Sequence, residues 1–382
     1  MDILEGALED NQREDEINDK ELVEELSNCS VGINNNVKVT PEKIYSIAVA
    51  PTNSKIVAFA GDAVGNIGVY DSSISSFTMK YSRPHSQTVT HLEFGDNGGL
   101  LSVGYDSTVR IMDVETGVHR QIFATFGKEE VCERWKGEPG YGVDEGEGYR
   151  FQYGCWDNDK GGIWLTTSFG NLMHFDIRSG KVGVNVRASG KKINCCSQNK
   201  TKDKLIAVGG LDREVKIFDI RKLGKYKKGG KAMKSPEALA TQDYGGSINS
   251  VFFSPGGDKL LTTSTADVIT VVKDAHLASG DMGGGKCQYI KHNNKTGRYL
   301  ATFMARWHPT LEVFTVGSMM QPRRIEMFGV DKKGKFGVRA NLKGEGVSAV
   351  CSRNCFHPNM PWLIGGSSSG RVSVCNVDVA GD

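Results

Sequence analysis

Apolar and polar residues alternate in short runs along most of the chain, and one such run recurs seven times. Each copy begins with a turn residue or two, continues with alternating apolar and polar residues, and in most cases ends in a carboxylate. Alternation with a period of two predicts β-strands, because successive side chains of a strand point to opposite faces. The seven copies are Gly65–Asp71, Ser107–Asp113, Asn171–Asp176, Asp212–Asp219, Asp267–Asp274, Arg323–Phe328 and Gly370–Asn376.

The spacing of these copies indicates the fold class. Asp71, Asp113, Asp176 and Asp219 end the first four copies and lie 42, 63 and 43 residues apart, so one interval carries an insertion. A repeat of about 40–45 residues that contains four strands is one blade of a β-propeller. The sequence therefore predicts an all-β, seven-bladed WD40-type β-propeller over residues 37–382.

Several local features fit this architecture. The insertion is assigned to Gly127–Glu147, a long, charged and glycine-rich loop. Val37–Thr40 is expected to pair with the last blade and close the ring, which removes exposed strand edges. Asp106 and Asp212 are expected to lie in the tight turn before the last strand of their blades and to hold that turn by accepting backbone N–H bonds. The carboxylates that end the copies are expected to cap their strands in the same way.

The charge is distributed unevenly. Residues 1–36 carry eleven Asp and Glu against Arg13 and Lys20, so this segment has a net charge of −9 and the rest of the chain +11. High charge with few aromatic residues predicts an acidic, disordered N-terminal tail, with one short helix at Lys20–Leu26. A basic body favours an anionic partner, most commonly nucleic acid, although a solubilising tail on an ordinary surface explains the charges equally well.

The chain lacks the patterns of several other classes of protein. It has no apolar run of about 18 residues, and its polar start at Met1-Asp2 is unlike a signal peptide, so we expect a soluble, intracellular protein with no membrane contact. No nucleophile elbow, phosphate-binding loop or zinc-protease motif is present, so no enzymatic activity and no cofactor are expected. Cys351, Cys355 and His357 come nearest to a metal site but lack a fourth ligand, so buried reduced thiols are predicted and no metal.

Longer phrases of the sequence carry a specific resemblance. They are Lys43–Pro51, Ala60–Asp71, Gly210–Lys222, Lys291–Pro309, Gly317–Phe328 and His357–Val372. On these phrases the chain resembles the WD repeat-containing protein 76 family, which is related to the small WD-repeat subunit of the damaged-DNA-binding heterodimer. The resemblance implies a seven-bladed, nuclear, non-enzymatic protein that binds duplex DNA, damaged DNA in particular, in the DNA damage response.

The resemblance also implies a DNA-contacting surface. In the damage-binding relative a hairpin before the sixth blade enters the duplex, and the matching residues here are Lys295–Tyr299. Turn-forming neighbours would expose Arg298 and Tyr299 at the apex beside Gly297, where an aromatic ring can stack on a base and arginine can pair with phosphate. The alternative is that Tyr299 packs inward in register with Ala301 and Phe303. Further phosphate contacts are implied for Arg110, Lys216, Arg323 and Arg324.

A second surface is implied by two copies of the sequence FDIR, Phe175–Arg178 and Phe218–Arg221. In substrate receptors of cullin-4 ubiquitin ligases a box of this type contacts the propeller adaptor through its arginine. The resemblance therefore places adaptor-binding residues at Asp176, Arg178, Asp219 and Arg221, on the face opposite the DNA-contacting rim. An exposed loop arginine without a partner is the alternative.

Two functions remain open at this level. The first is a nuclear DNA-binding propeller of genome maintenance that serves as a substrate receptor for a cullin-4 ligase. The second is a protein-interaction scaffold whose basic surface binds acidic chromatin proteins, such as histone chaperone tails, without affinity for DNA. Histones and other chromatin proteins are further candidate partners of either.

Overall fold

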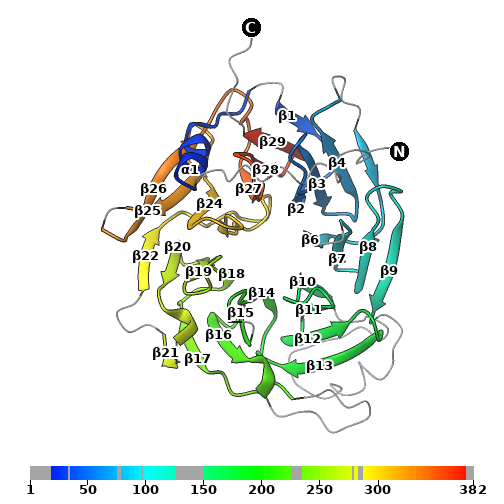
Figure 1. The fold of residues 1–382 in the computed structure, drawn as a ribbon, viewed down its shortest axis with the longest axis vertical. Helices are drawn as coiled ribbons and strands as arrows, with labels where there is room; N and C mark the ends of the chain where they lie inside the picture. Colours follow the sequence, from blue (N-terminus) through cyan, green and yellow to red (C-terminus); the bar gives the residue numbers. More distant parts are fainter. Residues whose placement is uncertain are drawn as a thin grey trace.

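The computed structural model describes residues 19–32, 35–74, 79–95, 98–125, 150–202, 204–224, 235–277, 279–282, 287–331 and 333–375. They form seven β-sheets arranged as blades around a central axis (Figure 1). In each blade the first strand along the chain lies nearest the axis, and the first strands of neighbouring blades contact one another. The predicted all-β, seven-bladed propeller is confirmed, with one α-helix among the described residues.

The strands of each blade follow one another outwards in chain order. Blades one to three are β2 (Ile44–Val49), β3 (Val57–Asp62), β4 (Ile67–Asp71) and β5 (Lys80–Ser82); β6 (Val89–Phe94), β7 (Leu100–Gly104), β8 (Thr108–Met112) and β9 (His119–Ala124); and β10 (Phe151–Trp156), β11 (Gly162–Thr167), β12 (Asn171–Asp176) and β13 (Lys181–Arg187). The loop Gly127–Glu147 between blades two and three lies outside the described residues.

Blade four has a fifth strand that the repeat pattern does not predict. It contains β14 (Ile193–Gln198), β15 (Leu205–Gly210), β16 (Glu214–Asp219), β17 (Ala240–Asp243) and, parallel to β17, β21 (Gly280–Asp281). Blades five and six are β18 (Ile248–Phe253), β19 (Leu260–Ser264), β20 (Val268–Val272) and β22 (Cys287–Lys291), followed by β23 (Arg306–Trp307), β24 (Val313–Gly317), β25 (Ile325–Val330) and β26 (Phe336–Leu342). Short 3-10 helices follow β16 (η3, Ile220–Lys222) and β20 (η4, Ala275–Leu277).

The last blade closes the ring with a strand from the other end of the chain. It contains β27 (Cys351–Phe356), β28 (Leu363–Ser367) and β29 (Arg371–Cys375), and its outer strand is β1 (Asn36–Lys38). β1 pairs antiparallel with β29, with Val37 opposite Val372, and the N–H of Val39 donates to the oxygen of Gly370 at 2.9 Å. The predicted closure by Val37–Thr40 is therefore confirmed.

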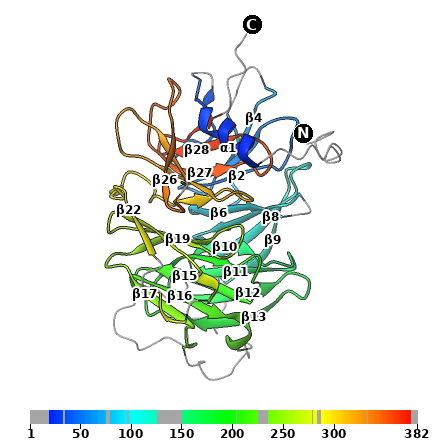
Figure 2. The same ribbon diagram turned by 60° about the vertical axis from the view of Figure 1, so that its left-hand side comes forward.

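The segment before β1 also packs on the ring. The helix expected at Lys20–Leu26 is present as α1 (Asp19–Asn28), and it lies beside β26 (Figure 2). Leu22 and Leu26 are buried in the cluster between blades six and seven, because their spacing of four residues places them on one face of the helix. The acidic segment is thus folded from Asp19 onward; residues 1–18 lie outside the described part of the chain. No helix in the described ranges is long and apolar enough to cross a membrane.

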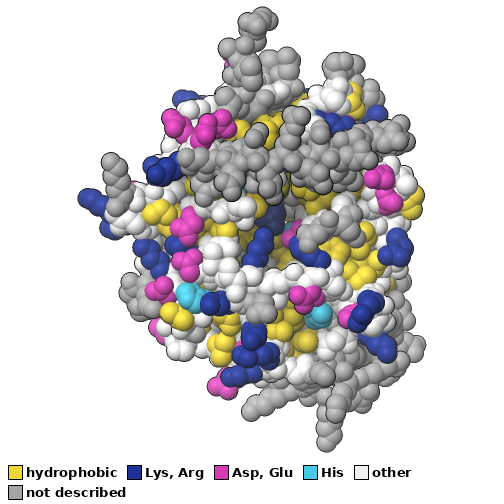
Figure 3. Space-filling model, viewed as in Figure 1, with side chains coloured by type: hydrophobic (Ala, Val, Ile, Leu, Met, Phe, Trp, Pro, Cys, Tyr) yellow, Lys and Arg dark blue, Asp and Glu magenta, His cyan; other side chains and the backbone are white. Residues whose placement is uncertain are grey.

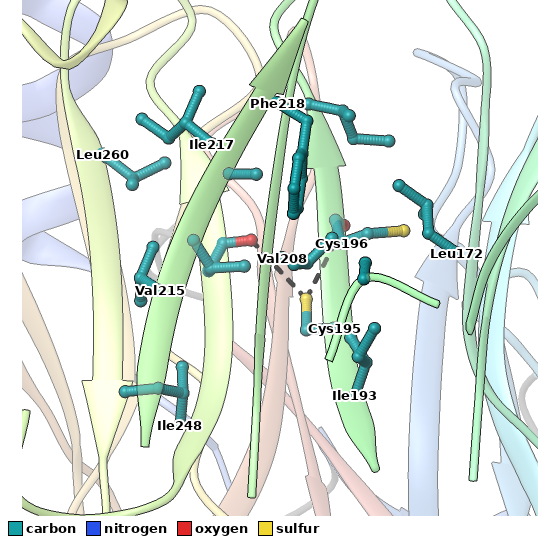
Figure 4. Packing of buried hydrophobic residues seen from close by; sticks show 14 of the residues in the cluster. Leu172, Ile193, Cys195, Cys196, Val208, Val215, Ile217, Phe218, Ile248 and Leu260 are labelled. Carbon is teal, nitrogen blue, oxygen red and sulfur yellow. Dashed lines mark hydrogen bonds between the residues drawn. The ribbon is translucent and has the colours of Figure 1, made fainter. Parts of the chain in front are cut away.

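The core lies between the blades. The second strands, such as β3 and β11, are buried on both faces because each is covered by neighbouring blades, whereas the outer strand β5 is exposed along its length. Figure 4 shows part of the largest cluster, in which Cys195 and Cys196 lie among aliphatic side chains and Phe218. Burial raises the pKa of the Cys195 thiol to about 12, so this thiol stays protonated. The eight cysteines of the described residues are all free.

The carboxylates of the repeat act as turn residues. Asp71, Asp113, Asp176 and Asp219 each accept an N–H bond from a residue two or three positions further on, at 2.9, 3.0, 2.7 and 3.0 Å. Asp106 accepts the N–H of Thr108, and Asp212 that of Glu214. These turns precede the third strand of the blade and not, as predicted, the last, because β9 and β17 follow further out. Carboxylates at these positions satisfy backbone donors that leave the strand ladder, so their predicted structural role is confirmed.

Candidate nucleic-acid interface

The antiparallel order of each blade determines which segments share a face of the ring. Segments that join one blade to the next lie at the same strand ends as the turns between second and third strands; we call this side the upper face. The other loops lie on the lower face. Gly370 illustrates the upper-face packing, because its φ of +76° brings the turn against the backbone oxygen of Thr40 with no room for a Cβ.

The segments that join the blades make the upper face cationic. Their acidic residues within the described ranges are Glu42 and Glu345. Their cations are Lys43, Arg83, Arg150, Lys191, Lys192, Lys295, Arg298 and Lys343. Cations that gather on one face supply a salt-dependent, sequence-independent attraction to a polyanion.

The segment before blade six carries an anchored turn, Lys295–Tyr299, which we call the apex turn. At its base Asn294 is buried, and its amide donates to the oxygens of Ser264 and Val268 at 2.9 and 3.2 Å. His292 Nδ1 lies 2.7 Å from Asn294 Oδ1, and the N–H of Asn294 donates to Asp267. This network satisfies the buried polar groups at the base, so the turn above it is held in a defined position.

The tip of the apex turn points into solvent. Tyr299 is 74% exposed, whereas Ala301 and Phe303, which follow at alternate positions, are buried. Gly297 has a φ of +61° and no neighbour near its Cβ position, so it lies in an open turn. The inward-facing alternate positions therefore start at Ala301 and do not include Tyr299. The aromatic ring of Tyr299 is available on the surface.

Arg298 and Tyr299 form a pair at this tip. The Arg298 guanidinium lies 5.1 Å from the centre of the Tyr299 ring, and its Nη2 donates to the Tyr299 hydroxyl at 3.1 Å. Lys43 donates to the backbone oxygen of Arg298 at 3.1 Å, which joins the turn to blade one. Lys295 is 76% exposed and pairs with Asp267 at 3.1 Å. The tip thus presents an aromatic ring and Arg298 together, beside Lys295 in an exposed pair with Asp267.

Arg323 and Arg324 lie in the upper-face turn of blade six, in the same sector as the apex turn. Arg323 donates to the oxygen of Met319 at 2.6 Å. Arg324 pairs at 3.0 Å with Glu326, which also lies 3.9 Å from His292. The charge of Arg324 is therefore balanced within the blade. Arg323, by contrast, donates to a neutral carbonyl.

Lys216 is brought to the upper face by β16, but its charge is used locally. Its ammonium lies 2.8 Å from both Asp212 and Glu214. Burial lowers the pKa of Lys216, but the two carboxylates outweigh burial and raise it. A lysine between two carboxylates contributes little positive potential, so its predicted phosphate contact lacks electrostatic support.

Arg110 lies apart from the apex turn, in blade two. It donates to Gln121 at 3.1 Å, and its buried Nε has no hydrogen-bond partner. The residue borders an open cavity of about 800 Å³ that Arg83 and Arg150 also line. The predicted DNA-contacting residues are therefore spread around the upper face, with only the apex turn and Arg323–Arg324 in one sector.

The predicted adaptor residues lie on the lower face, opposite the apex turn, as expected from their places after third strands. Arg178 is exposed, and Asp176 accepts the N–H of Ser179. Arg221 is instead held by both oxygens of Asp219 at 2.9 and 2.6 Å, and these bonds lower the pKa of Asp219. Figure 3 shows this face, which also carries α1, with acidic and basic side chains mixed around a central hollow.

Sequence reasoning missed the inner residues of the ring. Arg306 follows the apex turn closely in the sequence, but it enters the central channel and donates to the Tyr153 hydroxyl of blade three at 2.8 Å. Arg353 also enters the channel, from blade seven. For Arg306 the signal is an arginine between two apolar residues at the start of a first strand, whereas Arg353 lies between two polar residues and has no such signal.

No group of three His, Cys, Asp or Glu side chains that could hold a metal ion occurs within the described ranges. His357 of the candidate metal cluster uses both ring nitrogens inside the fold. Nδ1 accepts the N–H groups of Asn359 and Met360, and Nε2 donates to the oxygen of Thr52 at 3.0 Å. This histidine holds the lower-face loops together.

The chain is similar to proteins of fungi and animals. A family model described as WD domain, G-beta repeat matches residues 76–113. The chain is 27% identical over 366 residues to DNA damage-binding protein CMR1 of Chaetomium globosum, covering 88% of this chain and 64% of that protein. It is 31% and 29% identical to the WD repeat-containing protein 76 of Xenopus laevis and of Mus musculus, again over 88% of this chain and over 53% and 50% of those proteins.

These matches confirm the resemblance to the WD repeat-containing protein 76 family that the sequence phrases predict. The chain spans about half to two thirds of the length of these relatives.

Proposed function

We propose that this chain, as a relative of WD repeat-containing protein 76 and DNA damage-binding protein CMR1, is a nuclear DNA-binding propeller that acts in the DNA damage response. The observation that carries the proposal is the apex turn, where Arg298 and a 74% exposed Tyr299 project from an anchored base on the cationic face. The relatives' names associate such propellers with damaged DNA.

The chemistry of the apex turn fits a distorted duplex. An exposed tyrosine can stack on a base that has lost its neighbour, which contributes about 1–3 kcal/mol per contact. Unstacking costs least at a mismatched or damaged base, so the same ring would favour lesions. Arg298 and Lys295 would pair with phosphates beside the stacked base, and each such contact adds to the salt dependence of binding.

A fluorescence-anisotropy titration of labelled duplex DNA across ionic strengths tests the proposal. The wild-type protein should bind with an affinity that falls steeply as salt rises, and the slope reports the number of phosphates engaged. The double variant Lys295→Glu/Arg298→Glu should weaken binding by at least about tenfold at low salt, because it reverses two phosphate-facing charges. Arg178→Glu on the lower face is the matched control and should bind as the wild type does.

Two results would count against the proposal. Full affinity in the double variant would remove the apex turn from the interface. A flat wild-type titration at low salt would favour the second function, a scaffold for acidic chromatin proteins such as histone chaperone tails. The same titration with a duplex containing one mismatch tests the stacking role, because Tyr299→Ala should reduce any preference for the mismatch.

We further propose that the protein is a substrate receptor of a cullin-4 ubiquitin ligase and binds the ligase adaptor through its lower face. Both FDIR arginines are exposed, but only Arg221 is held by the carboxylate of its own copy. The planar guanidinium of Arg178 can therefore donate two parallel bonds to a partner. Arg178→Glu should abolish binding of the purified propeller adaptor in surface plasmon resonance, and Arg221→Glu should weaken it less. Equal affinity in Arg178→Glu and wild type would exclude this contact.

A further inference from the structure

The central channel of the ring contains two arginines that the upper-face proposal does not use. Arg306 lies over the Phe252 ring at 5.1 Å and donates to the Tyr153 hydroxyl on the far side of the ring. Arg353 donates to the backbone oxygen of Tyr45 at 2.7 Å, to the backbone oxygen of Thr302, and to the Thr302 hydroxyl at 3.3 Å. All of these acceptors are neutral.

Neither arginine is neutralised by a carboxylate. Among the described residues, no acidic side chain lies within ion-pair distance of Arg306 or Arg353. The negative charge of Glu93 raises the pKa of Arg306, but the Glu93 carboxylate is hydrogen-bonded to His91 and accepts the N–H of Trp156. Within the described part of the chain, Glu93 is thus the carboxylate that acts on Arg306, and it is already engaged.

The surroundings of Arg353 destabilise its charged form. Burial, together with the positive charge of Arg306, lowers the pKa of Arg353 to about 10, although the phenols of Tyr105 and Tyr45 oppose this shift. A guanidinium that is taken out of water without an anionic partner is destabilising, and an anion that reaches it recovers that free energy.

Arg353 lies near the upper end of the channel, three residues into the first strand of blade seven. Thr302, which it contacts, is exposed at the mouth of the channel, and Lys43 lies 5.0 Å above the ring of Tyr45 on the same side. The cavity that Arg353 lines together with Tyr45, Tyr153 and Arg306 has a volume of about 20 Å³, which is enough for little more than one water molecule. A ligand that approaches Arg353 from the upper mouth can therefore insert only the end of a side chain.

We propose that the upper mouth of the channel binds one carboxylate side chain of an acidic protein segment, with Arg353 as its ion partner and Tyr45 and Tyr105 as the walls. Aspartate and glutamate carry the carboxylate on a short flexible stem that can enter a narrow mouth, whereas duplex phosphates belong to a backbone too wide to follow. Arginine and tyrosine at the centre of a face are also the residues that most often dominate protein interfaces. This inference does not depend on DNA binding by the apex turn.

Fluorescence anisotropy with a labelled ten-residue polyglutamate peptide, at fixed ionic strength, tests the proposal. Arg353→Met should weaken peptide binding by at least about tenfold, the loss expected when a desolvated charge pair is removed. Arg298→Met is the matched control, because it removes one cation from the same face but outside the channel, and it should weaken peptide binding less than about threefold. With duplex DNA the order should reverse, so failure of one interface is distinguishable from failure of the other.

Equal losses in Arg353→Met and Arg298→Met would overturn the proposal, because they would indicate non-specific attraction to a cationic face. Binding of a polyglutamine peptide as tightly as polyglutamate to the wild-type protein would overturn it without any variant. Circular dichroism checks the fold of Arg353→Met; if that variant is unfolded, Arg353→Lys serves instead. Lysine retains the charge but loses the planar fork, so a loss of about three- to tenfold is expected, and wild-type affinity would contradict the assigned role.

Discussion

On the lower face the loops between first and second strands hydrogen-bond from blade to blade, whereas on the upper face the segment before blade six directs its charged tip into solvent. Asn158 donates to the oxygen of Asn199, Asn199 to that of Gly257, and His357 to that of Thr52. The apex turn has its polar bonds at its base and leaves Arg298 and Tyr299 outward. A polar residue of this ring is thus available to a partner only where the fold does not use its hydrogen bonds.

The largest expected effect concerns the lower-face histidines and acid pH. Burial lowers the pKa of both His308 and His357 to about 4, so both are neutral in the folded protein. The unfolded chain takes up these protons near pH 6.5, and each histidine should therefore remove on the order of 3 kcal/mol of stability as the pH falls from 6.5 to 4. Urea unfolding at a series of pH values measures this loss.

His357→Asn provides the matched test of the pH effect. An asparagine oxygen can accept the same two N–H bonds from Asn359 and Met360, but it does not titrate. The variant should be less stable at pH 7, because the bond to Thr52 is lost, and its stability should depend less on pH than that of the wild type. An unchanged pH dependence would contradict the assignment.

The next effect should come from the base of the apex turn. Asn294→Ala leaves the oxygens of Ser264 and Val268 buried without their donor and should cost about 2–3 kcal/mol of unfolding free energy. Asn293→Ala is the control, because the exposed Asn293 accepts only the N–H of Lys295 and should cost less than about 0.5 kcal/mol. Chemical denaturation of both variants separates the anchored base from the exposed tip; equal costs would mean that the base is not anchored.

A smaller effect distinguishes two lysines of the upper face. Lys295→Gln should reduce the salt slope of DNA binding by about one, because the exposed and therefore weak pair of Lys295 with Asp267 can be exchanged for a phosphate contact, which the variant loses. Lys216→Gln should leave the slope unchanged, since Asp212 and Glu214 already neutralise that lysine. The slopes come from titrations of the two variants at four or more salt concentrations. A larger change for Lys216→Gln than for Lys295→Gln would reverse the ranking of these sites.

The smallest effect is expected between the two FDIR arginines. Arg221→Ala breaks a bidentate pair with Asp219, but the arginine side chain is 64% exposed, so the loss of stability should be about 0.5 kcal/mol. Arg178→Ala should change stability by less than the experimental error. Thermal unfolding followed by circular dichroism suffices, and a larger loss for Arg178→Ala would show that the first copy, not the second, is the structural one.

Local patterns predicted most of the elements because each strand and turn depends on near neighbours. The seven runs, the turn carboxylates such as Asp113, the helix around Leu22 and the closure by Val37 all follow from periodicity and turn chemistry. The fifth strand of blade four could not be predicted in this way. Gly280–Asp281 pairs with β17, which is distant in the sequence, and no short pattern encodes that pairing.

The candidate site was predictable only in part. Tyr299 had two acceptable positions by alternation, and the buried bonds of Asn294 decide between them. Arg306 and Arg324 look equivalent to Arg298 in a count of charges, yet one crosses the channel and the other pairs with Glu326. Burial and ion pairing are properties of neighbours that are remote in sequence.

The sequence by itself thus determined the number and order of the blades, because period-two alternation and turn residues act over a few positions. It also determined that a cationic body follows an acidic segment. Only the tertiary structure decided which cations remain available, since a charge keeps its external field when no carboxylate packs against it. Arg298 at the apex and Arg353 in the channel contact neutral oxygens and keep their charge available. Lys216, Arg221 and Arg324 each pair with a carboxylate. Only the folded ring creates this difference.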